Sequence, residues 1–600
     1  MRYKTQHERW VEVRSRSVAL AITQHERRVE VRSRSVALAI TQHERRVEVR
    51  SRSVALATTQ HEGRVALSLN PTYKKWTRYR VVYAICLSEN RPLFKYFSYL
   101  SLTPCLKDTK VNSNMPNQNQ TPLVEALKAC QTRSHTPFYT PGHKRGTGIS
   151  PILKDLLGQD VFRADLTELA ELDNLFTPQS VILAAQKLAA EAFGAEKTWF
   201  LVNGSTCGIA AAILATCRMG EKIILPRNVH SSVISGLILS GAIPIFINPE
   251  YDKYLDIAYS IKPELLKAAL IKHPDTKAVL IVYPTYNGVC GNIKAILHLT
   301  NQYNIPLIVD EAHGAHFHFH PELPTSALTA GADLTIQSIH KTLGAMTQAS
   351  MLHIQGKRID IDRVNKALQL VQSTSPSFIL LASLDAARHQ MAIHGKNLMS
   401  QTWELAQEAI IKINQIPGLS TPLINSNKSP GFIDLDQTRL TVNISEIGFT
   451  GFAAEEILDK KFHVTPEFSS WQNLTFIISL GNTKADIQNL IQGLNNLTHV
   501  TPLTSECQPC NNIRDAIIIS DLSISPREAF FANSEVLPVE ETQDRICAEI
   551  ICPYPPGIPI LMPGEIITKS ALEYLQKIQN MGGFISGCAD ETLQTLKIVK

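Results

Sequence analysis

Short apolar runs alternate with helical stretches between residues 180 and 355, and this alternation restricts the chain to few folds. Runs such as TWFLV (198–202), KIILP (222–226) and AVLIVYP (278–284) are typical of buried strands. Helical stretches such as AAQKLAAEAFGA (184–195) lie between them. A helix between two strands usually serves as the crossover connection that joins parallel strands. The pattern therefore predicts an α/β fold, in which helices cover a mostly parallel sheet.

The first 114 residues have a different character. A repeat that opens with TQHE begins at Thr5, Thr23, Thr41 and Thr59. Its copies are nearly identical. Functional repeats usually diverge on their surfaces while they keep their core positions. Near-identity instead indicates a recent duplication. We expect residues 1–114 to be unstructured or to precede the true start, so that the working protein begins near Met115.

Composition and charge exclude several classes of protein. The net charge of +5 comes largely from the repeat, whose full copies carry four Arg and two Glu. No basic stripe with interleaved aromatic residues follows, so we expect no nucleic-acid partner. No apolar run reaches the roughly 18 residues of a membrane helix, and no signal-peptide pattern is present. With 11 scattered cysteines, the sequence favours a reduced, cytoplasmic protein without membrane contact.

Two sequence patterns could indicate a metal site. Cys507 and Cys510 form a CxxC motif without a second ligand pair nearby, which favours a surface loop over zinc binding or redox activity. The stretch LIVDEAHGAHFHFHPE (307–322) has four histidines within eight positions. Its last three histidines follow a glycine and alternate with phenylalanine, so they need not converge on one ion. We expect no metal centre.

Polar residues follow several of the predicted strands, where ligands of such sheets bind. The turn NGSTCG (203–208) offers backbone N–H groups and hydroxyls to a phosphate. His230 occupies the next turn, Asp310 ends LIVD, and Lys341 follows another strand. A lysine can form an imine with an aldehyde, and a carboxylate can keep a ring nitrogen protonated. This set predicts a site for pyridoxal 5'-phosphate (PLP).

Several separated motifs carry a family resemblance. From about residue 115 to residue 600 the chain resembles the short form of the bacterial ornithine/lysine/arginine decarboxylases, which have the fold-type I (aspartate-aminotransferase) architecture. The motifs are FYTPGHKRG (138–146), NGST (203–206), DEAHGAH (310–316), SIHKTLGAMTQAS (338–350), STSPSFILLASLD (373–385), SPREAFFA (525–532) and YPPGIPILMPGE (554–565). The resemblance implies a PLP-binding major domain (115–385), a small domain (386–505) and a C-terminal domain (511–600).

The resemblance also implies roles for individual residues. Lys341 would carry PLP, Asp310 would pair with the pyridinium nitrogen, and His230 would stack on the ring. His313 would lie close to the cofactor. The residues expected at the phosphate are Ser205, Thr206, Ser338 and His340. In a homodimer or higher homo-oligomer, Ser375 would approach the cofactor of the neighbouring subunit, and Glu565 is a weaker candidate for the substrate side.

The implied reaction is decarboxylation of a basic amino acid, arginine or lysine and less readily ornithine, to the amine and CO2. The cationic end of the substrate needs a carboxylate, and Glu565, Glu467 and Asp165 all qualify by type. Another PLP reaction on the same fold, such as transamination, is the alternative. Arg527 could serve that alternative by binding a substrate carboxylate. A non-catalytic PLP-binding protein is a further alternative.

Overall fold

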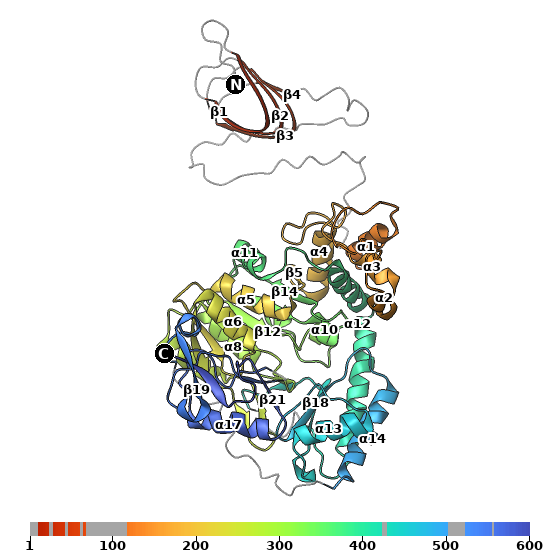
Figure 1. Ribbon diagram of the computed structural model, residues 1–600, viewed down its shortest axis with the longest axis vertical. Coiled ribbons are helices and arrows are strands. Elements are labelled where there is room, and N and C mark those ends of the chain that lie inside the picture. The colour runs from red at the N-terminus through yellow and green to blue at the C-terminus, as the bar shows by residue number, and fades with distance from the viewer. Residues whose placement is uncertain are drawn as a thin grey trace. The chain divides into compact units, whose positions relative to one another are not determined.

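The computed structural model describes residues 117–422, 429–501, 522–554 and 557–600, together with the backbone of four strands before them (Figure 1). The chain divides into two compact units, residues 1–114 and residues 115–600. Cys507 and Cys510 lie outside the described residues, as do parts of the repeat. Within the described ranges, every helix is too short or too polar to cross a bilayer.

The repeat forms a four-stranded parallel sheet. The strands are β1 (Trp10–Ile22), β2 (Arg28–Thr41), β3 (Arg46–Thr59) and β4 (Arg64–Leu67). Their register pairs each residue with its own copy, as in Val11 with Val29. The alternation of β-branched and polar residues within each copy explains the strands. That the working protein starts near Met115 stays a prediction.

The second unit is built on a seven-stranded sheet with the order β5-β14-β13-β12-β10-β6-β7. Only β14 runs antiparallel to its neighbours, so the sheet is mostly parallel as expected. The strands are β5 (Lys197–Leu201), β6 (Lys222–Pro226), β7 (Ile243–Ile247), β10 (Ala278–Val282), β12 (Leu307–Asp310), β13 (Leu334–Gln337) and β14 (Ser350–Ile354).

Both faces of this sheet are buried, which explains why its strands read as continuous apolar runs. Along β10, Val279 and Ile281 pack into one core and Ala278 and Leu280 into the other. The first core is covered by α1 (Pro122–Thr132), α4 (Val181–Phe193), α8 (Ile293–Gln302) and the start of α12 (Phe378–Ile413). The second is covered by α5 (Gly204–Thr216), α6 (Ser231–Ser240) and α11 (Ile361–Val371).

Helix α12 joins the major domain to the small domain (Figure 1). It is 36 residues long, and the predicted boundary between residues 385 and 386 falls inside it. The uninterrupted helical sequence leaves no linker at that position. The small domain holds a sheet of β16 (Arg439–Asn443), β18 (Asn473–Ile477) and β17 (Phe468–Ser469), with α13 (Gly451–Phe462) and α14 (Lys484–Thr498) packed on it.

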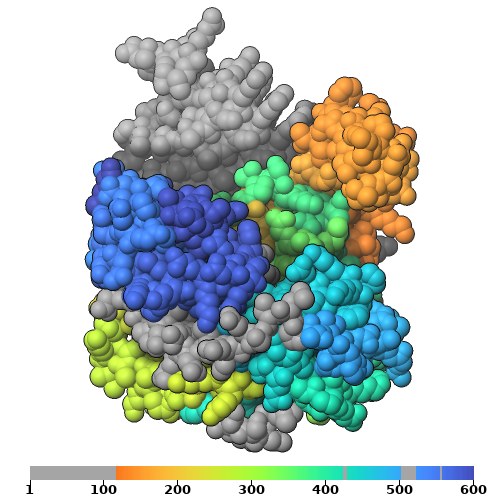
Figure 2. All heavy atoms as spheres, turned by 60° about the horizontal axis from the view of Figure 1, so that its bottom comes forward, coloured from red at the N-terminus to blue at the C-terminus, as the bar shows by residue number. Residues whose placement is uncertain are grey.

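The C-terminal domain has its own apolar core around α17 (Lys569–Asn580) and two short antiparallel ribbons. The ribbons pair β19 (Ser534–Pro538) with β22 (Thr595–Val599) and β20 (Cys552–Tyr554) with β21 (Phe584–Ser586). Lys577 lies 4.2 Å from the ring centroid of Trp471 in the small domain. Figure 2 shows these two domains, in blue and cyan, side by side on one face.

Candidate active site

The predicted lysine and carboxylate lie at the ends of two neighbouring strands. Asp310 is the last residue of β12 and pairs in register with Ile336 of β13. Lys341 lies in the short helix α10 (Ile339–Thr342), which begins directly after β13. Because these strands are parallel, their carboxyl ends meet at one edge of the sheet. Asp310 is buried and Lys341 is half-buried there.

A histidine links Lys341 to an arginine of the small domain. The Nζ atom of Lys341 lies 2.9 Å from Nε2 of His313. On the other side of the ring, Nη2 of Arg439 contacts Nδ1 of His313. The aromatic ring of Tyr286 packs edge-on against His313 with the ring centroids 5.6 Å apart. The site is thus built from the strand ends of the major domain and from β16 of the small domain.

Burial controls the charges in this cluster. It lowers the pKa of Lys341 to about 8, with Arg439 acting in the same direction and Asp310 against it. It also lowers the pKa of His313 far below its usual range and that of Arg439 to about 10. Burial raises the pKa of Asp310, although the Lys341 cation opposes this. The cluster therefore favours an anionic ligand near its cations and a cationic group near Asp310.

The expected phosphate residues are only partly brought together. The hydroxyl of Ser338 donates to Oγ of Ser205 at 2.9 Å, which places both hydroxyls at the start of α5. Gly204 has a φ of +72°, and a side chain at that position would meet no heavy atom within 4 Å. His340 contacts the carbonyl of Ala349 at 3.0 Å. Thr206 is exposed.

His230 precedes α6 and is close enough to Lys341 for the charge of that residue to affect its pKa. Its Nδ1 accepts from the backbone N–H of Ser232 at 3.1 Å. Burial, with the Lys341 cation acting in the same direction, lowers the pKa of His230 to about 4. The imidazole is therefore neutral at physiological pH, with the remaining proton on Nε2. A neutral flat ring near Lys341 is compatible with the expected stacking role, which stays a prediction.

Glu565 lies in a buried ion pair, whereas Ser375 lies on an exposed loop. Glu565 is fully buried, and its carboxylate accepts from Nε and Nη2 of Arg227 at 3.1 and 2.9 Å. This ion pair already occupies the carboxylate, so the structure does not support Glu565 as a substrate ligand. Ser375 is exposed on the loop before α12. Asp165, a further carboxylate considered for the substrate, lies 3.0 Å from Nε2 of His143.

The four clustered histidines diverge. His313 contacts Lys341, whereas His316 lies 3.1 Å from Oδ2 of the buried Asp436. His318 and His320 lie near Thr329 and Trp403 respectively. Among the described residues, no three His, Cys, Asp or Glu side chains are close enough together to hold a metal ion.

Arg439 was not among the residues predicted from the sequence, whereas Asp310 was chosen over its neighbour Glu311. Glu311 points away from the cluster, where its oxygens accept from the backbone N–H of Ala327 and from Gln337. A signal for Arg439 existed in the run RLTVN (439–443), since an arginine within a strand pattern is unusual and indicates a buried, functional charge. Arg527 donates to the carbonyls of Ile238 and Leu239 at the end of α6.

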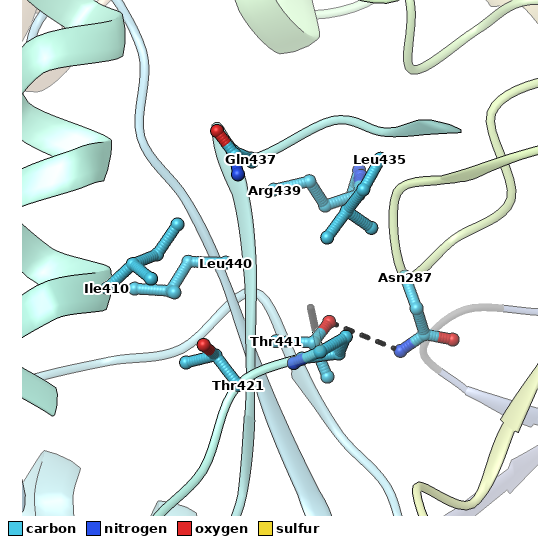
Figure 3. Close-up of a pocket in the computed structure, with 9 residues that line it drawn as sticks. Asn287, Ile410, Thr421, Leu435, Gln437, Arg439, Leu440 and Thr441 are labelled. Carbon is cyan, nitrogen blue, oxygen red and sulfur yellow. Dashed lines mark hydrogen bonds between the residues drawn. The ribbon is translucent and has the colours of Figure 1, made fainter. Parts of the chain in front are cut away.

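A separate small pocket lies beside β16 (Figure 3). Its wall includes the end of α12 and the residues around Arg439. The lining residues are Asn287, Ile410, Thr421, Pro422, Leu435, Gln437, Arg439, Leu440 and Thr441. Lys341, His313 and Asp310 do not line it, so the reacting groups lie outside this pocket.

The α/β fold, with a lysine and a carboxylate at adjacent strand ends, defines the fold-type I class of PLP-dependent enzymes. Within that class, residues 121–486 match the model of the Orn/Lys/Arg decarboxylase major domain. Residues 520–593 match the model of the Orn/Lys/Arg decarboxylase C-terminal domain. The chain therefore belongs to the Orn/Lys/Arg decarboxylase family, whose members decarboxylate basic amino acids. The predicted family, fold class and enzyme class are confirmed.

Individual relatives agree with this assignment. An arginine decarboxylase of Bacillus subtilis is 39% identical over 486 residues, covering 81% of this chain and 99% of the relative. A lysine decarboxylase of Pseudomonas aeruginosa is 25% identical, covering 76% of this chain and 75% of the relative. The solved constitutive lysine decarboxylase of Escherichia coli has a TM-score of 0.68 and 22% identity, covering 80% of this chain and 82% of that one. This last likeness shows the shared fold.

Proposed function

We propose that this chain is a PLP-dependent arginine decarboxylase, with lysine as the second candidate substrate and ornithine the third. The main support is the placement of Lys341 and Asp310 at adjacent strand ends, inside the region that matches the family model. Arginine comes first because the relative with 39% identity across almost its whole length is an arginine decarboxylase.

The residues present fit the cofactor. Arg439 is buried, and its Nη1 has no hydrogen-bond partner among the described residues. An unpaired buried donor of this kind is costly unless an anionic ligand accepts from it. The open turn at Gly204, with the Ser205 and Ser338 hydroxyls, suits a phosphate. Bound PLP would supply the electron sink that takes up the electrons released with CO2.

The chain's own residues would hold and orient the reacting groups. Lys341 would anchor the cofactor, and Asp310 would keep a proton on the nitrogen of its ring. Burial of Asp310 makes a cationic partner favourable, because the lone carboxylate is poorly solvated there. His230 and His313 would bound the site as neutral rings, since burial lowers the pKa of both.

Glu467 is our candidate for binding the cationic end of the substrate. It is exposed, and its negative charge acts on Lys341, Arg439 and His340. It therefore lies at the rim of the cluster with its carboxylate accessible. Of the other two candidates, Glu565 is paired with Arg227 and Asp165 lies against His143. Glu467 is thus the one best placed to receive a guanidinium or ammonium group.

We also propose a homodimer or higher homo-oligomer, with Ser375 facing the cofactor of the partner. The exposure of the 373–375 loop is compatible with this role. Sedimentation of the purified protein, with and without a Ser375→Trp substitution, would test it. A monomeric protein with full activity would contradict the proposal.

Transamination is the second candidate, and one observation favours it. Nη1 of the buried Arg439, which has no partner in the described part of the chain, could bind the carboxylate of an amino acid and so retain it. Incubation of the pure protein with arginine, lysine and ornithine separates the two reactions. Decarboxylation predicts equal amounts of CO2 and amine without keto acid, fastest with arginine. Formation of keto acid without CO2 would overturn the proposal.

A further inference from the structure

Lys341, His313 and Arg439 form a chain of three nitrogen-bearing groups in which both ends are donors in their usual charged forms. Lys341 Nζ lies 2.9 Å from His313 Nε2, and Arg439 Nη2 contacts His313 Nδ1. Both His313 and Arg439 are buried. The ring is thus held between an amine and a guanidinium, and only certain proton placements satisfy both contacts.

Counting donors leaves one arrangement. A guanidinium has N–H donors and no acceptor, so Nδ1 of His313 must accept from Arg439. A neutral imidazole that accepts at Nδ1 carries its proton on Nε2. The Nε2–H group then faces Lys341, which can accept only as an uncharged amine. A charged ammonium on Lys341 would place two donors against each other, as would a charged imidazole next to Arg439.

We infer that Arg439 is a positioning residue that fixes the Nε2–H tautomer of His313 and thereby favours the uncharged amine of Lys341. The uncharged amine is the form that reacts with an aldehyde. Arg439 comes from β16 of the small domain, whereas Lys341 and His313 belong to the major domain. These three residues, here called the relay, can therefore favour the uncharged form of Lys341 only when the small domain is packed against the major domain.

The other charged groups around Lys341 do not replace this relay. Asp310, at the end of β12, and Glu467, before β17, both favour the charged amine. His230 and His340 are neutral because burial lowers the pKa of each. Burial and the charge of Arg439 lower the pKa of Lys341 to about 8, and the proposed hydrogen bond from His313 would act in the same direction.

Competitive acetylation measures the protonation of Lys341 directly. The full-length chain, freed of cofactor, is pulsed with isotopically labelled acetic anhydride from pH 6 to pH 10, and the Lys341 peptide is quantified by mass spectrometry. Only the uncharged amine is acetylated. In the unmodified chain the rate should rise tenfold per pH unit up to about pH 8 and then level off.

Two substitutions and their combination test the relay. Arg439→Met and His313→Phe should each move the midpoint upward by about one pH unit, so that labelling at pH 7 falls about tenfold. The double variant should show no larger shift than the larger single one, because both changes break the same chain. Arg358→Met, which removes an arginine bonded to Asp333 away from Lys341, should leave the midpoint unchanged.

An unchanged midpoint in His313→Phe would overturn the inference, since Arg439 would then act by its charge alone. Additive shifts in the double variant would overturn it as well. If Arg439→Met fails to fold, as judged by its thermal melt, His313→Phe decides the question. The inference rests on the proposed function for the role of Lys341. The assay uses neither cofactor nor substrate, so its result and that of the decarboxylation assay are judged separately.

Discussion

Two buried arginines of this protein have opposite surroundings. Arg227 donates from all three of its nitrogens, to both oxygens of Glu565 and to the carbonyls of Pro559 and Ile560. Arg439 has a histidine on one nitrogen and, among the described residues, no partner on Nη1, and its charge lowers the pKa of the nearby Lys341. The first is a neutral ion pair between the major and C-terminal domains, with a hydrogen bond on every nitrogen of the guanidinium and on both carboxylate oxygens. The second belongs to a cluster in which one buried donor has no partner among the described residues.

This difference distinguishes residues that stabilise the fold from residues that take part in the reaction. A fully bonded ion pair has no capacity left for a ligand, and its contribution is to hold two domains in one arrangement. A buried cation with a free donor is unfavourable unless a ligand completes it. Substitutions in the Arg227–Glu565 pair should therefore change stability and spare the reaction. Substitutions in the cluster should change the reaction and spare stability.

The largest effect is expected at Lys341. Lys341→Ala removes the only group proposed to attach the cofactor, and release of CO2 should fall by at least about 10⁴-fold. The thermal midpoint of the cofactor-free protein should stay close to that of the parent, because Lys341 is only half-buried. Residual turnover within tenfold of the parent would place the attachment site elsewhere.

Asp310→Asn should have the next largest effect. The amide cannot hold a proton on the cofactor ring by charge, so kcat should fall about 10²- to 10³-fold, as for other lost electrostatic contacts at reacting groups. Cofactor absorbance should show that the variant still binds PLP. A kcat within twofold of the parent would mean that the carboxylate at the end of β12 is not part of the chemistry.

Glu565→Gln tests the other side of the comparison. It leaves the buried Arg227 without a counter-charge, and the free energy of unfolding should fall by about 3–5 kcal/mol. Chemical denaturation measures this, and kcat per folded molecule should not change. Replacing both residues, Arg227→Met with Glu565→Leu, should cost less than the single change. A loss of kcat without a loss of stability would show that Glu565 takes part in the reaction.

Glu467→Gln should have the smallest effect. Loss of one charged contact to the cationic end of the substrate should lower kcat/KM about ten- to hundredfold, mainly through KM. Glu446→Gln, at an acidic side chain in the short helix before α13, is a matched control that should leave KM unchanged. If kcat/KM falls equally for an uncharged amino acid of similar length, Glu467 does not bind the cationic end of the substrate.

The sequence predicted the parts of the site that local pattern controls. Alternating strands and helices place Asp310 and Lys341 at strand ends, and the sheet then brings them together. The position of Arg439 could not be predicted in this way. Its approach to Lys341 depends on how the long helix α12 and the sheet of the small domain pack against the major domain. The pairing of Glu565 with Arg227 depends on how the C-terminal domain docks, and no periodicity encodes that contact.

The central claim is that Lys341 carries the cofactor, and borohydride reduction tests it most directly. The purified protein is incubated with PLP, reduced and digested, and its peptides are analysed by mass spectrometry. We predict a single stoichiometric pyridoxyl adduct on the Nζ atom of Lys341, absent from Lys341→Ala. An adduct on a different lysine, or none at all, would contradict the account.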